Sequence, residues 1–134
     1  MTTDLVAPFK TALDNGSQTL SDIARDGRRV FGYFCTYTPI ELVDACGWVP
    51  IRISGGPGPL EKSYTRVPDF ICPYMKRSLE KALNGEYSYL SGIIDGYTCD
   101  AACGVANIWA DTNDDVRQLG SVQVGDVVRV EQVD

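Results

Sequence analysis

The sequence predicts an α/β domain in which a short parallel sheet is flanked by helices. Three short apolar runs, at residues 30–35, 48–54 and 90–96, each lead toward a segment with helix signals, and such strand–helix alternation is typical of a parallel sheet. The chain has 134 residues, which is about one domain and enough to bury a core without disulfides.

Residues 2–26 are expected to form an N-terminal helix. Apolar side chains recur there at roughly helical spacing, namely Leu5, Phe9, Leu13, Leu20 and Ile23. The pair Asn15-Gly16 favours a break within this region, because asparagine and glycine are common in turns.

The apolar and aromatic run VFGYFC, residues 30–35, is expected to form a buried strand. Thr38 before Pro39 is a helix-start signal, because a hydroxyl caps free amides and proline suits the first turn. A helix is therefore expected over residues 39–46, ending at Gly47.

The second strand is expected at residues 48–54, where Pro50 suits the start of a strand or an edge position. The Gly/Pro run 55–59 predicts a loop, since it suits neither a strand nor a helix. The next helix should begin near Cys72-Pro73 and end at Asn84-Gly85.

The third strand, 90–96, is expected to lead into a helix over 98–109, capped by Thr98 or Asp100. The resulting order predicts a Rossmann-like sheet, equivalent to half of a flavodoxin-type fold. We expect residues 1–109 to form this α/β domain and residues 110–134 to form an acidic tail. Its alternating pattern predicts a strand pair around Gly125-Asp126, which is expected to pair at a sheet edge or with another chain.

The charge pattern argues against nucleic acid as a partner. The net charge is −6, and residues 111–134 carry six acidic and two basic side chains, so the remainder is nearly neutral and has no basic stripe. The chain contains no histidine, which excludes Ser/His and Cys/His catalytic pairs and imidazole metal ligands within it.

The five cysteines indicate free thiols in a reducing compartment, and we expect a cytoplasmic protein. No apolar run reaches the roughly 18 residues of a membrane span, and no signal peptide is expected at the start of the sequence.

Three of the cysteines, Cys35, Cys72 and Cys99, each follow a short apolar run and lead into a helix. They are expected to converge at one edge of the sheet, where ligands bind in open α/β folds. A helix N-terminus favours a thiolate, which is the form that binds metals. The spacings match no common zinc or ferredoxin motif, and each thiol could equally be a small buried hydrophobic group, as fits Cys46 and Cys103 better.

Two segments, GYFCTYTPIELVDACGWVPIRI and ICPYMKRSLEKALNGEYSYLSGIIDGYTCDAACGVANIW, carry a family resemblance. Over residues 28–109 the chain resembles the N-terminal portion of the 2-hydroxyacyl-CoA dehydratase and benzoyl-CoA reductase family, which includes the 2-hydroxyglutaryl-CoA dehydratase D-component. The resemblance rests on the TPIEL turn, the CP helix start with its GEY helix end, and the TCD turn.

The resemblance implies a 4Fe–4S cluster with Cys72 and Cys99 as ligands and Cys35 as a third candidate. It also implies dehydration of a 2-hydroxyacyl-CoA through a one-electron, ketyl-radical mechanism. The expected partners are an acyl-CoA substrate, a homologous dehydratase subunit and an ATP-dependent iron–sulfur activator. Because family subunits are roughly three times as long and carry a further ligand in a second α/β domain, the chain resembles a truncated or split piece. The alternatives are a benzoyl-CoA-reductase-like or other small-molecule reductase subunit, and a truncated, non-catalytic domain that is structural or binds a partner.

Other candidate residues follow from their chemistry. Thr36, Thr38 and Glu41 lie in the first turn and could move protons, although a cap and a first-turn charge explain Thr38 and Glu41 more simply. The cations Arg52, Lys62 and Arg66 flank the Gly/Pro loop and could bind CoA phosphates, but solvated surface charge explains them equally well.

Overall fold

Four parallel strands form the centre of the structure, a computed structural model that describes residues 4–112 and 117–121. The strands are β1 (Val30–Tyr33), β2 (Val49–Arg52), β3 (Gly92–Asp95) and β4 (Arg117–Ser121), in the spatial order β2-β1-β3-β4. This confirms the predicted parallel α/β class, and the order begins as a flavodoxin-type sheet does. Pro50 lies on β2, at an edge of the sheet, where its missing N–H is tolerated.

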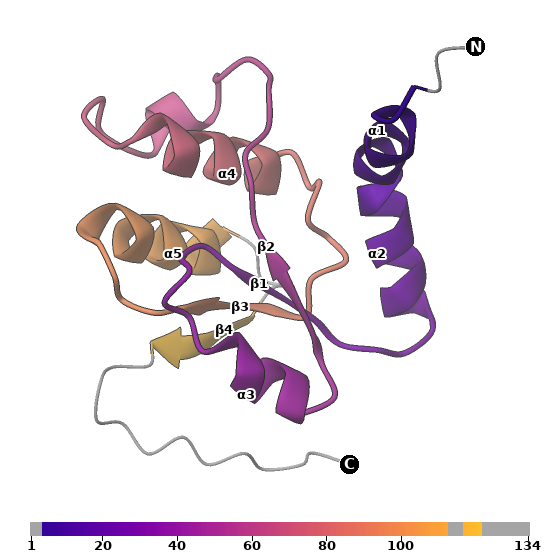
Figure 1. The fold of residues 1–134 in the computed structure, drawn as a ribbon. Helices are drawn as coiled ribbons and strands as arrows, with labels where there is room; N and C mark the ends of the chain where they lie inside the picture. The colour runs from indigo at the N-terminus through magenta and orange to yellow at the C-terminus, as the bar shows by residue number, and fades with distance from the viewer. Residues whose placement is uncertain (1–3, 113–116, 122–134) are drawn as a thin grey trace.

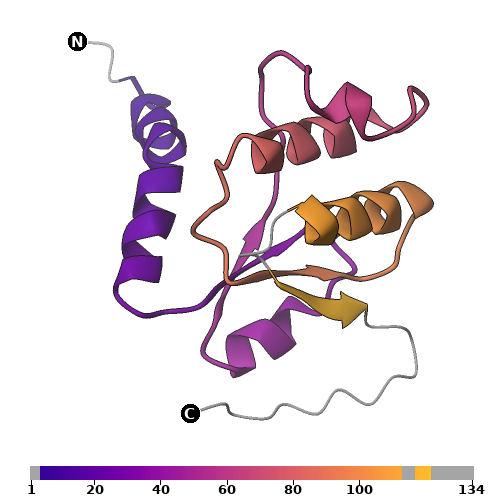
Figure 2. The ribbon, with the colours of Figure 1, turned by 180° about the vertical axis from the view of Figure 1, so that it is seen from behind.

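Helices cover both faces of the sheet (Figure 1). The helices α4 (Pro73–Leu83) and α5 (Asp100–Thr112) pack together on one face, and α3 (Ile40–Ala45) lies on the other. The helices α1 (Ala7–Asp14) and α2 (Gly16–Arg25) stand to one side, as the reverse view in Figure 2 also shows. They meet at Asn15, which confirms the break predicted there.

The main hydrophobic core lies between the sheet and the pair α4 and α5. Its fully buried members include Val30, Ile53, Leu79, Ile93, Val105 and Trp109. The Trp109 ring stacks on Tyr87, with ring centroids 5.4 Å apart, and meets the edge of Phe34 at 5.9 Å. Burying each such side chain contributes roughly 1.5–3 kcal/mol, so this layer holds the helices and the strand ends in fixed positions.

The end of β2 is tied to α4 and to the segment that follows this helix. The Tyr74 hydroxyl donates a hydrogen bond to the Ile53 carbonyl, and the Tyr87 hydroxyl donates to the Ser54 carbonyl at 2.6 Å. Just beyond, Gly55 passes so close to α4 that an added Cβ would lie 2.0 Å from the Arg77 Cβ. Only glycine fits at this crossing.

Two predicted helix caps are wrong. The residue before α3 is Pro39 and no side chain caps that helix, while the buried Thr38 Oγ1 has no hydrogen-bond partner. At α5 the capping atom is the Cys99 sulfur, which accepts a hydrogen bond from the Ala102 amide at 3.3 Å, in place of Thr98 or Asp100. In both cases the loop backbone places a neighbouring residue at the cap position.

The region after residue 109 is only partly described. The helix α5 continues to Thr112, and β4 pairs in parallel with β3 at an edge of the sheet. The predicted strand pair around Gly125-Asp126 lies outside the described residues. Within the described part of the chain, no helix has the length and apolar character needed to cross a bilayer.

Candidate functional site

The loops that follow β1 and β3 form the candidate site. These strands are neighbours in the sheet, yet their following helices, α3 and α5, pack on opposite faces. The strand order reverses direction here, and open α/β sheets bind ligands at such a switch point. Cys35 lies in the loop after β1 and Cys99 in the loop after β3, so the structure brings these two predicted residues to the same place.

The environment of Cys35 favours its thiolate. The pKa of the thiol lies below its ordinary value of 9.0 because the Thr98 hydroxyl and the Tyr37 and Thr36 amides donate hydrogen bonds to the sulfur. The positive charge of Arg52 adds to this effect, while partial burial opposes it. A half-buried thiol with these donors is suited to act as a metal ligand or a nucleophile.

Cys99 is exposed at the N-terminus of α5, while Cys103, one turn later, is buried. Burial, followed by a hydrogen bond to Asp95 and the negative charge of that carboxylate, raises the pKa of Cys103 to about 11. Cys103 therefore remains a neutral thiol at physiological pH, in keeping with its prediction as a packing residue.

Cys72 is the exposed residue that precedes α4, with Pro73 in the first turn of that helix. Among the described residues no group of three or more Cys, Asp or Glu side chains could hold a metal ion, so the structure does not bring Cys72 together with the other two thiols as a ligand set. The donor set thus fits an iron–sulfur cluster in part: it supplies thiols at one edge of the sheet, but not a complete ligand cage. Cys46, at the end of α3, is half-buried.

The predicted proton-transfer candidates lie in or near the first turn but differ in exposure. Thr36 is exposed, Thr38 is buried, and Glu41 is exposed in the first turn of α3. Thr38 lies beneath the loop after β3, since its Oγ1 would be 3.5 Å from a Cβ added at Gly96. It is therefore next to the switch point, although its hydroxyl is not open to solvent.

The predicted phosphate-binding cations are dispersed. Arg52 is exposed at the end of β2 and lies close enough to influence Cys35. Lys62 is turned onto α4, where its ammonium donates a hydrogen bond to the Leu83 carbonyl at 3.0 Å, and Arg66 is exposed after a short 3-10 turn, η1 (Ser63–Thr65). Of these three cations, Arg52 is the one that lies close enough to a cysteine, Cys35, to affect its pKa.

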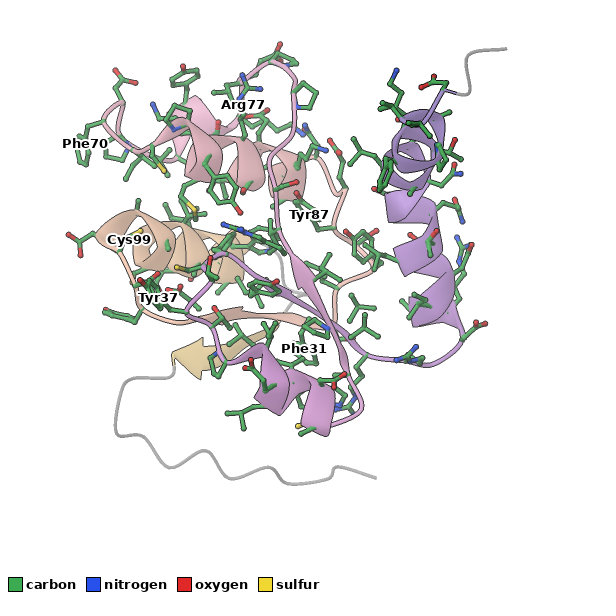
Figure 3. The ribbon with its side chains drawn as sticks, in the orientation of Figure 1. Phe31, Tyr37, Phe70, Arg77, Tyr87 and Cys99 are labelled. Atoms are coloured by element: carbon green, nitrogen blue, oxygen red, sulfur yellow. The ribbon has the colours of Figure 1, made fainter. Side chains whose placement is uncertain are left out.

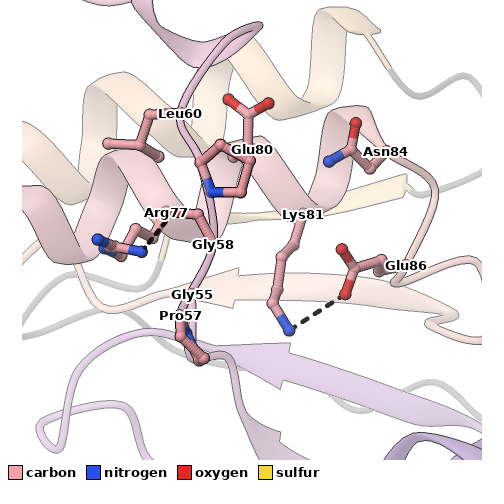
Figure 4. Close-up of a pocket in the computed structure, with 10 residues that line it drawn as sticks. Gly55, Pro57, Gly58, Leu60, Arg77, Glu80, Lys81, Asn84 and Glu86 are labelled. Atoms are coloured by element: carbon pink, nitrogen blue, oxygen red, sulfur yellow. Dashed lines mark hydrogen bonds and ion pairs between the residues drawn. The ribbon is translucent and has the colours of Figure 1, made fainter.

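A separate small pocket, of about 190 Å³, lies between the Gly/Pro loop and α4 (Figure 4). Arg77 donates hydrogen bonds to the carbonyls of Gly56 and Gly58, at 3.2 and 2.8 Å. Lys81 forms an ion pair with Glu86 at 3.1 Å. Arg77 and Lys81 are therefore already engaged by other groups of the chain. Their contacts in this pocket fasten the Gly/Pro loop to α4.

Sequence reasoning missed Asp95 and gave Thr98 only the role of a helix cap. Asp95 ends β3 with 1% of its surface exposed, and its Oδ1 has no hydrogen-bond partner. A charged residue that ends an apolar strand was the available signal. Figure 3 shows Cys99 and Tyr37 at this same end of the sheet.

Comparison with known proteins identifies the family. A sequence model described as 2-hydroxyglutaryl-CoA dehydratase, D-component, matches residues 35–120, which include all three candidate thiols. The chain belongs to this family. Its D-component resemblance, predicted from the CP and TCD turns, is confirmed.

Relatives of the D-component family include three with different described activities. The chain is 37% identical over 94 residues to the (R)-phenyllactyl-CoA dehydratase beta subunit of Clostridium sporogenes, covering 69% of this chain and 25% of that protein. It is 29% identical to the beta subunit of lactoyl-CoA dehydratase from Anaerotignum propionicum, covering 81% and 30%. It is 26% identical to a benzoyl-CoA reductase subunit from Thauera aromatica, covering 64% and 23%. The chain therefore spans between a quarter and a third of the length of the two dehydratase subunits.

Proposed function

We propose that this chain is the thiol-bearing lobe of a 2-hydroxyacyl-CoA dehydratase subunit and holds part of an iron–sulfur cluster. The observation that carries the proposal is the switch point of a D-component family member, where Cys35 and Cys99 lie in adjacent loops and hydrogen bonds favour the Cys35 thiolate.

Cys72, Cys99 and Cys35 are the proposed cluster ligands, and a 4Fe–4S cluster would need a fourth ligand from outside the described residues. When bound, such a cluster supplies single electrons at low potential. The chain's own residues hold the thiolates: Thr98 donates to Cys35, and the turn that begins α5 presents Cys99.

We propose that the edge of the sheet where Cys35 and Cys99 lie is covered by another protein surface, such as that of a homologous dehydratase subunit. Large aromatic side chains beside the thiols support this, since Tyr37 is 84% and Phe70 85% exposed. Tyr97, between Asp95 and Cys99, is 55% exposed and adopts a left-handed φ of +52°, a strained conformation of the kind found at functional sites. The further proposed partners are an acyl-CoA substrate and an ATP-dependent iron–sulfur activator in the cytoplasm.

Anaerobic reconstitution with iron and sulfide tests the proposal. A cluster should produce an absorption band near roughly 400 nm, where thiolate-bound iron clusters absorb. Cys72→Ala and Cys99→Ala should reduce iron uptake, whereas Cys46→Ala, a matched removal of a thiol that lies elsewhere, should leave it unchanged. The absence of any band in the full chain and its complexes would favour a structural or partner-binding role without a cluster.

Reduction of an aromatic acyl-CoA is a second candidate, because the relative from Thauera aromatica is described as a benzoyl-CoA reductase subunit. The two reactions differ in their products: dehydration releases water and leaves an enoyl thioester, whereas reduction adds electrons and protons to a ring. Incubating the assembled complex with 2-hydroxyacyl-CoA and benzoyl-CoA separately, followed by mass analysis of the thioesters, distinguishes them.

A further inference from the structure

Lys76 is a buried cation on the helix that begins at Cys72. Only 5% of its surface is exposed. Its ammonium donates a hydrogen bond to the Asp69 carbonyl at 2.6 Å and lies 4.7 Å from the centre of the Tyr64 ring. The side chain therefore ends between the η1 turn and the segment that precedes α4.

No carboxylate forms an ion pair with Lys76 among the residues the structure describes. Burying an ammonium without an anionic partner is unfavourable, because the group loses its hydration. One charge-assisted hydrogen bond and one aromatic face offset part of that loss. A methionine of similar length would fill the same space without this cost, so packing alone does not explain a lysine here.

The contacts of Lys76 bracket the segment 69–72. The side chain binds the carbonyl of Asp69 at the beginning of this segment, and the backbone amide binds the carbonyl of Cys72 at its end, at 3.1 Å. The Ile71 amide, within the segment, donates a hydrogen bond to the carbonyl of Pro68, just before it, at 3.1 Å and so forms a turn. One residue thus closes the loop that exposes Phe70 and Cys72.

We propose that Lys76 is a positioning residue for Cys72: it fixes the segment 69–72, and with it the position of the exposed thiol at the start of α4. The importance of this positioning for cluster binding rests on the proposed function. The Lys76 contacts that hold the segment 69–72, which we call the clamp, do not depend on it. Cys35 is held by a hydrogen bond from Thr98, in the loop after β3, and Cys99 by the Ala102 amide of its own helix, whereas Cys72 precedes a different helix, α4. It therefore needs a separate device to fix its position.

Hydrogen exchange of the Ile71 amide reports on the turn that the Lys76 contacts hold in place, because this amide donates to the Pro68 carbonyl. Lys76→Met keeps the length of the side chain but removes its donors and charge, so the amide should exchange at least about tenfold faster, as expected for loss of a hydrogen bond to a charged group. Lys76→Arg should restore most of the protection. The matched control is Lys81→Met, on the same helix, which should leave the Ile71 amide unchanged. Equal exchange rates in the Lys76→Met variant and the wild type would overturn the proposal.

Reconstituted iron content provides the second readout. Lys76→Met should retain about as little iron as Cys72→Ala, whereas Lys76→Arg and Lys81→Met should match the wild type. If the wild type binds no iron, the proposed function fails while hydrogen exchange still tests the clamp. If Lys76→Met does not fold, Tyr64→Leu removes only the exposed ring under the ammonium. It should speed exchange at Ile71 by about threefold, the effect of a lost cation–π contact, and no change there would refute the clamp.

Discussion

The Thr98 hydroxyl donates a hydrogen bond to the Cys35 sulfur, and so joins the loop after β3 to the loop after β1. The two residues are 63 positions apart in the sequence. Their contact exists because β1 and β3 pair directly, with Tyr33 beside Ile94, so both loops begin at the same edge of the sheet. The pKa of Cys35 therefore depends on the loop that carries Cys99.

Thr98→Val should make Cys35 less reactive in the metal-free chain. The hydroxyl is the largest of the influences that lower the pKa of Cys35, so its removal should raise that pKa back toward 9.0. The rate of alkylation by iodoacetamide, followed on the Cys35 peptide, should then rise at higher pH than in the wild type. Thr98→Ser keeps the hydroxyl and should behave as the wild type does. An unchanged pH profile in the valine variant would show that Thr98 does not control the thiolate.

Gly55→Ala should destabilise the fold strongly. A Cβ at Gly55 would lie 2.0 Å from the Arg77 Cβ and 2.5 Å from the Arg77 carbonyl carbon, which are atoms of a helix that cannot move away easily. Overpacking of this kind costs about 1–3 kcal/mol or more, measured by urea unfolding. Gly104→Ala is the matched control, because nothing lies within 4 Å of a Cβ there. It should stabilise α5 by roughly 0.5–1 kcal/mol, since alanine favours helices over glycine.

Glu80→Gln should weaken the link between α4 and the η1 turn. The buried Glu80 carboxylate accepts hydrogen bonds from the amides of Glu61, Lys62 and Ser63, at 3.1, 3.1 and 2.8 Å. Burial opposes ionisation, but these donors outweigh it and hold the pKa of Glu80 below its ordinary value of 4.5. Losing the charge should reduce the free energy of unfolding at pH 7 by about 1.5–3 kcal/mol.

The pH dependence of this effect has a definite sign. Because the folded-state pKa of Glu80 is depressed, its contribution is complete above the ordinary value of 4.5 and is lost as the pH falls through the folded-state pKa. The stability difference between the wild type and Glu80→Gln should therefore be constant near neutral pH and shrink in acid. A difference that grows as the pH falls would contradict this assignment.

The sheet and the start of α4 could be predicted because they depend on local patterns, whereas the relative positions of the three thiols depend on long-range packing. Apolar runs such as residues 30–35 and helix starts such as Cys72-Pro73 are readable within a few neighbours. The long-range contacts could not be predicted from the sequence. Thr98 meets Cys35, and Glu80 meets the η1 turn, only after distant segments of the chain pack together. The Lys76 clamp is closer in sequence, but its burial depends on the η1 turn and Tyr64. Propensity favoured Thr98 or Asp100 as the cap of α5, and the loop conformation placed Cys99 there instead.

Replacing Cys99 in two ways should separate its structural role from its proposed ligand role. The sulfur caps α5 by accepting a hydrogen bond from the Ala102 amide, so Cys99→Ala should lose up to about 1 kcal/mol of stability, whereas Cys99→Ser keeps an acceptor at the cap and should retain it. A serine is a poor ligand for iron compared with a thiolate, so both variants should lose iron after reconstitution. Urea unfolding of the metal-free variants and iron analysis of the reconstituted ones measure the two roles independently. If Cys99→Ser binds as much iron as the wild type, Cys99 is a helix cap and not a cluster ligand.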